Sequence, residues 1–348
     1  MAENGSRRIR LGMVGGGTGA FIGAVHRIAA RIDGDYDLVA GAFSSKPAVS
    51  KESGRNLGID PSRVYGSYEE MAKAEAARPD GIEAVSIVTP NNVHYHPAKV
   101  FLEAGIHVIC DKPLTSTLAD ARALAEVKPA KGAKFLLTHN YTGYPLVRQA
   151  RELVKSDALG KIRVVQVEYP QDWLTNAPDP GNKQASWRTD PKRSGAGGAI
   201  GDIGTHAYNL ARFITGLKVE AVSADLQSFV KGRKVDDNVN VLLRFRGGAR
   251  GMLWASQVAP GNENALKIRV YGEKAGLEWR QENPNQLWFT ELGKPAQLLT
   301  RGGAISQPPA ASMNVRIPGG HPEGYLEAFA TLYSQFAEVI RGSGKGYV

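Results

Sequence analysis

Short apolar runs alternate with amphipathic helical patterns through the first 140 residues. Each run has the length and near-continuous hydrophobicity of a strand buried in a parallel sheet. The runs lie at residues 9–14, 36–43, 84–89, 107–110 and 133–138. Helical patterns follow at 21–30 and after the capping signals at Ser67 and Thr117. Repeated strand and helix units of this kind predict a doubly wound α/β sheet.

The second half of the chain has a different pattern. After a helix expected over 145–154, residues alternate between apolar and polar, which predicts antiparallel strands between glycine or charged turns. These strands are expected at 162–169, 219–229, 238–245, 250–257, 266–271 and 276–279. Residues 174–193 are rich in proline, glycine and charge, and we expect a lid or binding loop there. A last helix is expected to open at 321–325 and to run through Ile340.

Composition narrows the class of protein. A chain of 348 residues exceeds what one compact core usually holds, so two domains are expected. With 42% hydrophobic and 22% charged residues, the chain has the composition of a soluble globular protein. The N-terminus lacks the apolar core of a signal peptide, which favours a cytoplasmic location. The single cysteine, Cys110, excludes an internal disulfide framework and is expected in the core.

The net charge of +9 comes from basic residues scattered among acidic ones, without a nucleic-acid-binding motif. We therefore expect no nucleic-acid partner, and no apolar run is long enough to predict a membrane partner. A positive surplus also suits an anionic cofactor or substrate. His94 and His96, two residues apart and without a nearby carboxylate, make a weak ligand set, so no metal is expected.

A glycine-rich turn, Gly15-Gly16-Gly17-Thr18-Gly19, follows the first predicted strand and precedes the first predicted helix. This context is typical of dinucleotide sites, because the glycines allow a tight turn and the helix N-terminus receives the pyrophosphate. Gly17 and Gly23 are farther apart than in the simplest motif, which predicts a longer phosphate loop. A purely structural turn is the alternative.

Ser44, Ser45 and Lys46 occupy the end of the second predicted strand. NAD-specific sites usually carry a carboxylate there to bind the ribose hydroxyls. We expect NAD as the cofactor, and NADP stays possible because Lys46 could pair with a 2′-phosphate.

A second glycine-rich stretch, residues 195–201, leads to Asp202 and His206 at the start of a helical pattern. Residues four apart share one face of a helix. A carboxylate beside an imidazole can fix its tautomer, as a proton-transferring site requires. A solvated surface pair is the alternative, and the glycines and the upstream cofactor signals favour a functional pair.

Four motifs in order give the chain a family resemblance: Gly15–Gly17, Thr89–His94, Gly105–Pro113 and Gly197–His206. Over nearly its whole length the chain resembles the glucose-fructose oxidoreductase/inositol dehydrogenase family (Gfo/Idh/MocA). The resemblance implies a dinucleotide-binding Rossmann domain over 1–140. It also implies a substrate-binding and oligomerisation α+β domain over 141–348, built on a large open, mostly antiparallel sheet.

The same resemblance implies that Lys112 of an E-K-P-like motif and Asp202 and His206 of a D-x-x-x-H motif are catalytic. Asp111 replaces the more usual glutamate, whose contact is to the nicotinamide ribose. Expected cofactor contacts come from Gly15, Gly17, Gly19, Phe21, Ile22, Ser44, Ser45, Lys46, Thr89, Pro90, Asn91, His94, Asp111, Lys112, Asn140, Trp187 and Arg188. Expected substrate contacts come from Tyr141, Gln171, Trp173, Arg188, Asp202, His206 and His321. Trp173 and Trp187 also offer flat apolar faces of the kind that stack on sugar rings, with ordinary packing as the alternative.

The combined prediction is an NAD(P)-dependent dehydrogenase that oxidises a secondary hydroxyl of a cyclic polyol or sugar, such as an inositol or a pyranose, to the ketone. An aldose or anhydro-sugar dehydrogenase acting at C1 or C3 is the enzymatic alternative. A non-catalytic, nicotinamide-sensing regulator is the alternative of another class. The resemblance further implies a homo-oligomer, a dimer or tetramer formed through the C-terminal sheet, and a terminal helix beyond Val348.

Overall fold

The computed structural model describes residues 7–177, 179, 181–303 and 315–344, without the side chain of Lys183. Residues 1–6, which include part of the N-terminus discussed for its lack of a signal peptide, lie outside the described residues. The chain forms two compact units, Met1–Thr138 with Phe329–Val348 and His139–Ala328. The functional domains predicted at 1–140 and 141–348 stay a prediction, and the compact units differ from them because the C-terminal residues belong to the first unit.

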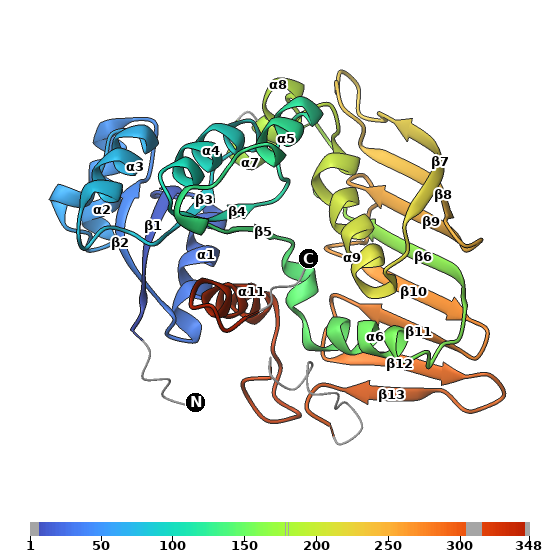
Figure 1. Ribbon diagram of the computed structural model, residues 1–348. Coiled ribbons are helices and arrows are strands. Elements are labelled where there is room, and N and C mark those ends of the chain that lie inside the picture. The colour runs from blue at the N-terminus through green and yellow to red at the C-terminus, as the bar shows by residue number, and fades with distance from the viewer. Residues whose placement is uncertain (1–6, 178, 180, 304–314, 345–348) are drawn as a thin grey trace. The chain divides into compact units, whose positions relative to one another are not determined.

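A five-stranded parallel sheet with the strand order β2-β1-β3-β4-β5 forms the first unit (Figure 1). The doubly wound prediction is confirmed. Its strands are β1 (Ile9–Gly15), β2 (Tyr36–Ala42), β3 (Ala84–Val88), β4 (His107–Asp111) and β5 (Phe135–Thr138). Its helices are α1 (Phe21–Ile32), α2 (Pro47–Asn56), α3 (Tyr68–Ala77), α4 (Tyr95–Glu103) and α5 (Leu118–Ala125), with most of α11 (Tyr325–Ile340).

The strands of this sheet are buried as their hydrophobic runs predict. Every residue of β3 is buried, and so are Val108, Ile109 and Cys110 in β4. Both predicted caps form: the Ser67 hydroxyl accepts from the Glu70 amide at 3.2 Å, and the Thr117 hydroxyl accepts from the Asp120 amide at 3.1 Å. Each satisfies an amide that the first turn of a helix leaves without an intrahelical partner.

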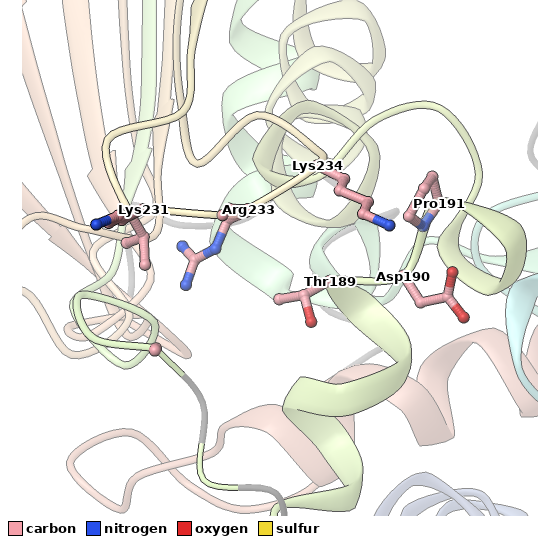
Figure 2. A pocket seen from close by; sticks show the side chains of 9 residues that line it. Thr189, Asp190, Pro191, Lys231, Arg233 and Lys234 are labelled. Atoms are coloured by element: carbon pink, nitrogen blue, oxygen red, sulfur yellow. The ribbon is translucent and has the colours of Figure 1, made fainter.

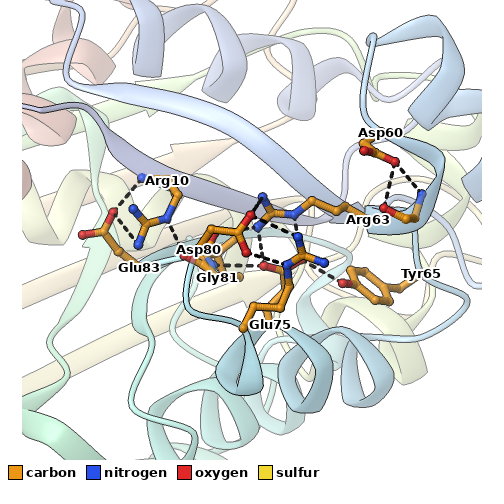
Figure 3. A network of polar contacts seen from close by, with 11 residues as sticks. Arg10, Asp60, Arg63, Tyr65, Glu75, Asp80, Gly81 and Glu83 are labelled. Atoms are coloured by element: carbon orange, nitrogen blue, oxygen red, sulfur yellow. Dashed lines mark hydrogen bonds and ion pairs between the residues drawn. The ribbon is translucent and has the colours of Figure 1, made fainter.

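A buried ion pair connects α3 with the segment that follows α2 (Figure 3). Glu75 accepts hydrogen bonds from Arg63 Nε at 3.0 Å, the Tyr65 hydroxyl at 2.8 Å and the Ile82 amide at 3.0 Å. Glu75 is 1% exposed and Arg63 is 8% exposed. Because both carboxylate oxygens have donors, the cost of burying this charge is offset within the network.

The second unit is built on an eight-stranded sheet of order β13-β12-β11-β10-β6-β9-β8-β7. Only β6 and β9 run parallel to each other among its paired strands. The strands are β6 (Ile162–Pro170), β7 (Val219–Gln227), β8 (Asn238–Phe245), β9 (Arg250–Ser256), β10 (Lys267–Gly272), β11 (Ala275–Arg280), β12 (Gln286–Glu291) and β13 (Gln297–Thr300). The mostly antiparallel prediction is confirmed, although β6 interrupts the expected meander between β9 and β10.

Two helices, α6 (Pro145–Lys155) and α9 (Thr205–Thr215), cover one face of this sheet. Val239 and Trp279 on that face are fully buried. On the other face Leu242 is 63% exposed and Trp288 is 44% exposed. The loop expected over 174–193 contains two short helices, α7 (Lys183–Arg188) and α8 (Pro191–Ser194), each begun by an Asn or Asp side-chain cap. Among the described residues, no helix is long and apolar enough to cross a membrane.

Candidate functional site

The glycine turn after β1 is packed against α1. Gly15 and Gly16 have φ angles of +79° and +70°, a region that favours glycine. A Cβ on Gly23 would lie 2.3 Å from the Gly16 Cα, so the helix approaches the turn too closely for a side chain. Within the described residues no side chain caps the N-terminus of α1. This glycine cradle at a helix start fits a dinucleotide pyrophosphate.

The turn lies where the strand order reverses, between β1 and β3. Gly15 is paired with Val88, the last residue of β3, so the predicted Thr89-Pro90-Asn91 segment begins beside the glycine turn. The Gly17 amide donates to the Phe43 carbonyl oxygen at 3.2 Å, which connects the turn to the end of β2. There Ser45 and Lys46 are exposed at the start of α2. Such a switch point is where doubly wound sheets bind their ligands.

His94 is fully buried under this edge of the sheet. Its Nδ1 lies 2.7 Å from the Pro113 carbonyl oxygen and its Nε2 lies 3.0 Å from the Thr89 carbonyl oxygen. Burial lowers its pKa, although both carbonyl contacts act in the opposite direction. The ring thus bridges two segments predicted to contact the cofactor, and its own exposed surface is nil.

Asp111 is directed into the first unit. Its Oδ1 accepts from the Thr138 hydroxyl at 3.0 Å and lies 3.5 Å from Nε2 of His26. Burial raises the pKa of Asp111, but the hydrogen bond and charge of His26, with the charges of Lys112 and His94, bring it down to about 2. His26 is fully buried, and its Nδ1 lies 2.8 Å from the Tyr333 hydroxyl. No sequence signal marks His26, because it lies within the apolar pattern of α1.

The remaining cofactor candidates of the first unit differ in exposure. Phe21 is 63% exposed at the start of α1, whereas Ile22 packs on the core around Met13 and Phe43. Lys112, which follows β4, is partly exposed. Lys112 belongs to the first unit, whereas Asp202 and His206, the other two predicted catalytic residues, belong to the second unit.

Asp202 lies in a π-helical turn, Ile200–Gly204, that leads directly into α9. The helical segment expected from Asp202 onward therefore begins with a wider turn than an ordinary α-helix has. Arg188 Nε donates to the Asp202 Oδ2 at 3.1 Å and Gln257 Nε2 donates to the same oxygen at 2.9 Å. Single π turns inside helices are frequent at functional sites.

Arg188 connects Asp202 with the predicted tryptophans. Its guanidinium carbon lies 4.2 Å from the ring centre of Trp187 and 5.8 Å from that of Trp173. The side chain is also held by Gln184, whose Oε1 accepts from Arg188 Nη1 at 2.6 Å. Four residues predicted from the loop and the D-x-x-x-H motif are thus brought together: Trp173, Trp187, Arg188 and Asp202.

His206 is 7% exposed in the first turns of α9, among aromatic rings. Its ring centre lies 4.8 Å from that of Tyr141, 5.6 Å from that of His139 and 6.3 Å from that of Tyr169. The Tyr141 ring meets it edge to face at 80°. Burial raises the pKa of both the Tyr141 and the Tyr169 hydroxyls, so both are protonated at neutral pH. These rings fix the plane of the imidazole by packing.

A hydrogen-bonded chain runs from these tyrosines to the predicted Gln171. The Tyr141 and Tyr169 hydroxyls are hydrogen-bonded, and Tyr169 donates to Asn264 Oδ1 at 2.6 Å. Gln171 Nε2 donates to the same Asn264 oxygen at 2.7 Å, and its own Oε1 accepts from Trp173 Nε1 at 3.0 Å. Asn264 and Gln257 were not predicted as site residues, because no local motif marks either position.

Two predicted residues lie apart from these contacts. His321 is exposed, and its carbonyl oxygen accepts from the Arg301 guanidinium. Asn140 is 2% exposed in the short helical turn Asn140–Gly143. Their expected contacts with substrate and cofactor stay predictions.

Comparison with known proteins identifies the family to which both parts of the chain belong. Residues 9–141 match the oxidoreductase family with an NAD-binding Rossmann fold, and residues 147–278 match the Gfo/Idh/MocA C-terminal domain. An oxidoreductase from Sinorhizobium meliloti is 58% identical, with a TM-score of 0.88 over 97% of this chain and 90% of that chain. An inositol dehydrogenase homolog from Azotobacter vinelandii, solved with NADH and myo-inositol, is 40% identical, with a TM-score of 0.91 over 97% and 87%.

Levoglucosan dehydrogenase of Pseudarthrobacter phenanthrenivorans is a more distant relative, 28% identical over 310 residues that cover 81% of this chain and 76% of its own. The class is thus an oxidoreductase whose N-terminal part is an NAD-binding Rossmann domain. The chain belongs to the Gfo/Idh/MocA family, which the motifs predicted, and its relatives include sugar and polyol dehydrogenases.

Proposed function

We propose that the protein oxidises a secondary hydroxyl of a cyclic polyol or sugar, with an inositol as the first candidate. The observation that carries the proposal is the setting of Asp202 and His206. The carboxylate is held by Arg188 and Gln257, and the imidazole is packed edge to face on Tyr141. A similar protein with 40% identity was solved with NADH and myo-inositol, which supports the choice of substrate class.

His206 is assigned as the base that takes the hydroxyl proton, because an imidazole changes protonation state near neutral pH. Asp202 is assigned to orient the imidazole and to stabilise its cationic form. The nicotinamide, when bound, supplies the acceptor for the hydride. Lys112 is assigned to donate a hydrogen bond to the same substrate oxygen, where its charge complements the developing alkoxide. The roles of Lys112 and His206 could be exchanged.

The glycine cradle Gly15–Gly19 and Phe21 are assigned to the pyrophosphate, and Ser44, Ser45 and Lys46 to the adenosine ribose. Trp173, Trp187 and Arg188 are assigned to the substrate ring. Flat aromatic faces match the apolar faces of a sugar ring, and the guanidinium and Gln171 supply hydrogen-bond donors for the other hydroxyls. An anhydro-sugar fits the same chemistry, and levoglucosan dehydrogenase is among the relatives.

The exposed face of the eight-stranded sheet is assigned to association between copies of this chain. Leu242, Tyr271 and Trp288 are each more than 40% exposed on β8, β10 and β12. Large apolar side chains left exposed along one face of a sheet are candidates for an interface. Analytical ultracentrifugation of the wild-type chain and of Leu242→Asp tests this assignment: the variant should dissociate, and an unchanged mass would contradict it.

A panel of polyols and sugars, assayed with both NAD and NADP by absorbance of the reduced cofactor, tests the proposal. We expect turnover of at least one inositol or cyclic sugar. Turnover of aldoses alone, oxidised at C1, would favour the enzymatic alternative. Cofactor binding without turnover of any panel member would favour a nicotinamide-sensing regulator and contradict the proposal.

A further inference from the structure

The π-helical turn that carries Asp202 is held from outside by one carboxylate. Asp236, in the segment before β8, accepts from the Gly198 amide through Oδ1 and from the Ile200 amide through Oδ2, both at 2.7 Å. Its backbone oxygen accepts from the Ala199 amide at 2.9 Å. Three consecutive amides at the start of the helical segment thus bond to Asp236. A carboxylate at a helix N-terminus is also favoured by the helix dipole.

The same contact explains why residue 198, ahead of the turn, is a glycine. A Cβ on Gly198 would lie 2.0 Å from the Asp236 carbonyl oxygen, so only glycine allows this approach. Asp236 is 8% exposed. Gly198, one of the glycines in the stretch 195–201, is therefore required by a close backbone contact with the segment before β8.

The neighbouring Asp237 holds the Asp202 side chain by a second route. The backbone carbonyl oxygen of Asp237 accepts a hydrogen bond from the backbone amide of Gln257 at 2.8 Å. The side-chain amide of Gln257 in turn donates to Asp202 Oδ2 at 2.9 Å. The Asp237 carboxylate accepts from the Phe229 amide at 2.9 Å and the Val230 amide at 3.0 Å.

Asp237 is itself anchored by a buried ion pair. Arg233 Nη1 lies 3.3 Å from Asp237 Oδ2, and both side chains are at most 2% exposed. Arg233 Nη2 also donates to the Leu174 carbonyl oxygen at 2.8 Å, at the start of the loop that carries the tryptophan residues. Arg233 forms one wall of a pocket of about 260 Å³ that Thr189, Asp190 and Lys234 also line (Figure 2).

We propose that Asp236 and Asp237 are positioning residues for the dehydrogenation: Asp236 sets the backbone of the turn, and Asp237, through Gln257, sets the carboxylate of Asp202. This inference rests on the proposed function, because it assumes that Asp202 and His206 act on substrate. Neither aspartate contacts Asp202 directly through its own side chain, and both act through another group. Their removal should therefore change kcat more than KM for the polyol.

The first test replaces Asp236 by asparagine, which keeps the shape and removes one acceptor. One of the Gly198 and Ile200 amides then loses its partner, and the turn shifts. We expect kcat to fall about tenfold or more, because small displacements of acid–base groups are costly, while KM changes little. The Kd for NAD, measured by fluorescence, should stay unchanged. Asp157→Asn, an exposed carboxylate after α6 that pairs with Lys274, is the matched control and should keep wild-type kcat.

The second test uses Gln257, so that the proposal stays testable if the Asp236 variant does not fold. Gln257→Leu removes the donor to Asp202 and should lower kcat about tenfold. Gln257→Glu places a second carboxylate against Asp202 and should move the acid limb of the pH profile of kcat upward by about one unit. Asp202 interacts with the Arg188 guanidinium and with the hydroxyls of Tyr141 and Tyr169, and these groups are identical in all variants.

The outcomes separate the two proposals. If the wild-type chain oxidises no panel member, or if His206→Ala keeps full activity, the proposed function is wrong. If His206→Ala is inactive while Asp236→Asn and Gln257→Leu keep wild-type kcat, the positioning role is wrong. A pH profile of Gln257→Glu that matches the wild-type profile would also contradict it. Loss of kcat in folded variants, with the shifted acid limb, supports it.

Discussion

The two units hold their polar groups in different ways. In the first unit, the predicted cofactor cradle is mainly backbone: a glycine turn, a helix start and the ends of β1, β2 and β3. Its buried charged side chains, Glu75 and Asp111, are satisfied inside the unit. In the second unit, the candidate site consists of side chains held by other side chains, as Asp202 is by Arg188 and Gln257.

Because of this difference, we expect substitutions in the two units to have different consequences. A backbone cradle tolerates changes in the side chains around it, so losses in the first unit, apart from those at the proposed catalytic Lys112, should appear as stability or cofactor preference. A site of mutually held side chains is displaced when one partner is lost, so losses in the second unit should appear in kcat and KM. The predictions below test this contrast.

The largest effect on stability is expected from Glu75→Ala in the first unit. The change leaves the buried Arg63 guanidinium without Glu75, although the exposed Asp80 carboxylate stays 3.8 Å from its Nη1. Removing one partner of a buried pair costs about 3–5 kcal/mol. Urea unfolding measures the loss, and kcat below the unfolding transition should be unchanged. Glu103→Ala, which breaks an exposed pair with Lys99, is the control and should cost less than about 0.5 kcal/mol. Equal losses for both variants would contradict the role given to burial.

A pH-dependent effect is expected from Asp111. Its folded pKa of about 2 lies below the ordinary value of 3.8, so the carboxylate stabilises the fold above pH 3.8 and this contribution is lost as the pH falls toward 2. The shift corresponds to about 2 kcal/mol. Unfolding of wild-type protein and Asp111→Asn should differ by that amount near neutral pH and converge toward pH 2. A difference independent of pH would argue against the His26–Asp111 interaction.

In the second unit, Trp187→Ala removes one predicted face of the substrate site and the ring stacked on Arg188. We expect KM for the best polyol to rise about fivefold, the scale of one aromatic contact, with little change in the Kd for NAD. Leu292→Ala, at a position that is 81% exposed after β12, is the control and should leave KM unchanged. An unchanged KM with a lower Tm for Trp187→Ala would assign this tryptophan to the core instead.

The smallest effect is expected from Lys46→Asp at the end of β2. The change removes a cation and adds a carboxylate that repels a 2′-phosphate, so binding of NADP should weaken more than binding of NAD. Titration of both cofactors against the variant measures the ratio of their Kd values. Equal weakening of both would show that Lys46 does not contact the 2′ position.

The two units also differ in how much of their structure the sequence could predict. The strands and caps of the first unit are local signals, and Ser67, Thr117 and the glycine turn behave as their patterns predict. The neighbours of Asp202 are not local: Gln257 and Asp236 lie 55 and 34 residues farther along the chain. Their roles depend on the order of strands, and β6 lies between β9 and β10 where the pattern predicted a meander.

His26 shows the same limit within the first unit. Its position in α1 fits the apolar pattern, and only the fold brings it to Asp111 and Tyr333. The π turn is a further example, since Asp202 and His206 have the spacing of an ordinary helix. The wider turn follows from the three amides held by Asp236. Periodicity therefore predicts elements, and contacts between distant segments determine the site.

The most direct test of the central claim is kcat for the best polyol in His206→Ala and Lys112→Ala, measured at saturating NAD beside the Kd for NAD and the circular dichroism spectrum of each variant. Each variant should lose at least about 10²-fold in kcat, the scale of one acid–base group, while dinucleotide binding and the fold are retained. Full activity in a folded His206→Ala variant would contradict the account.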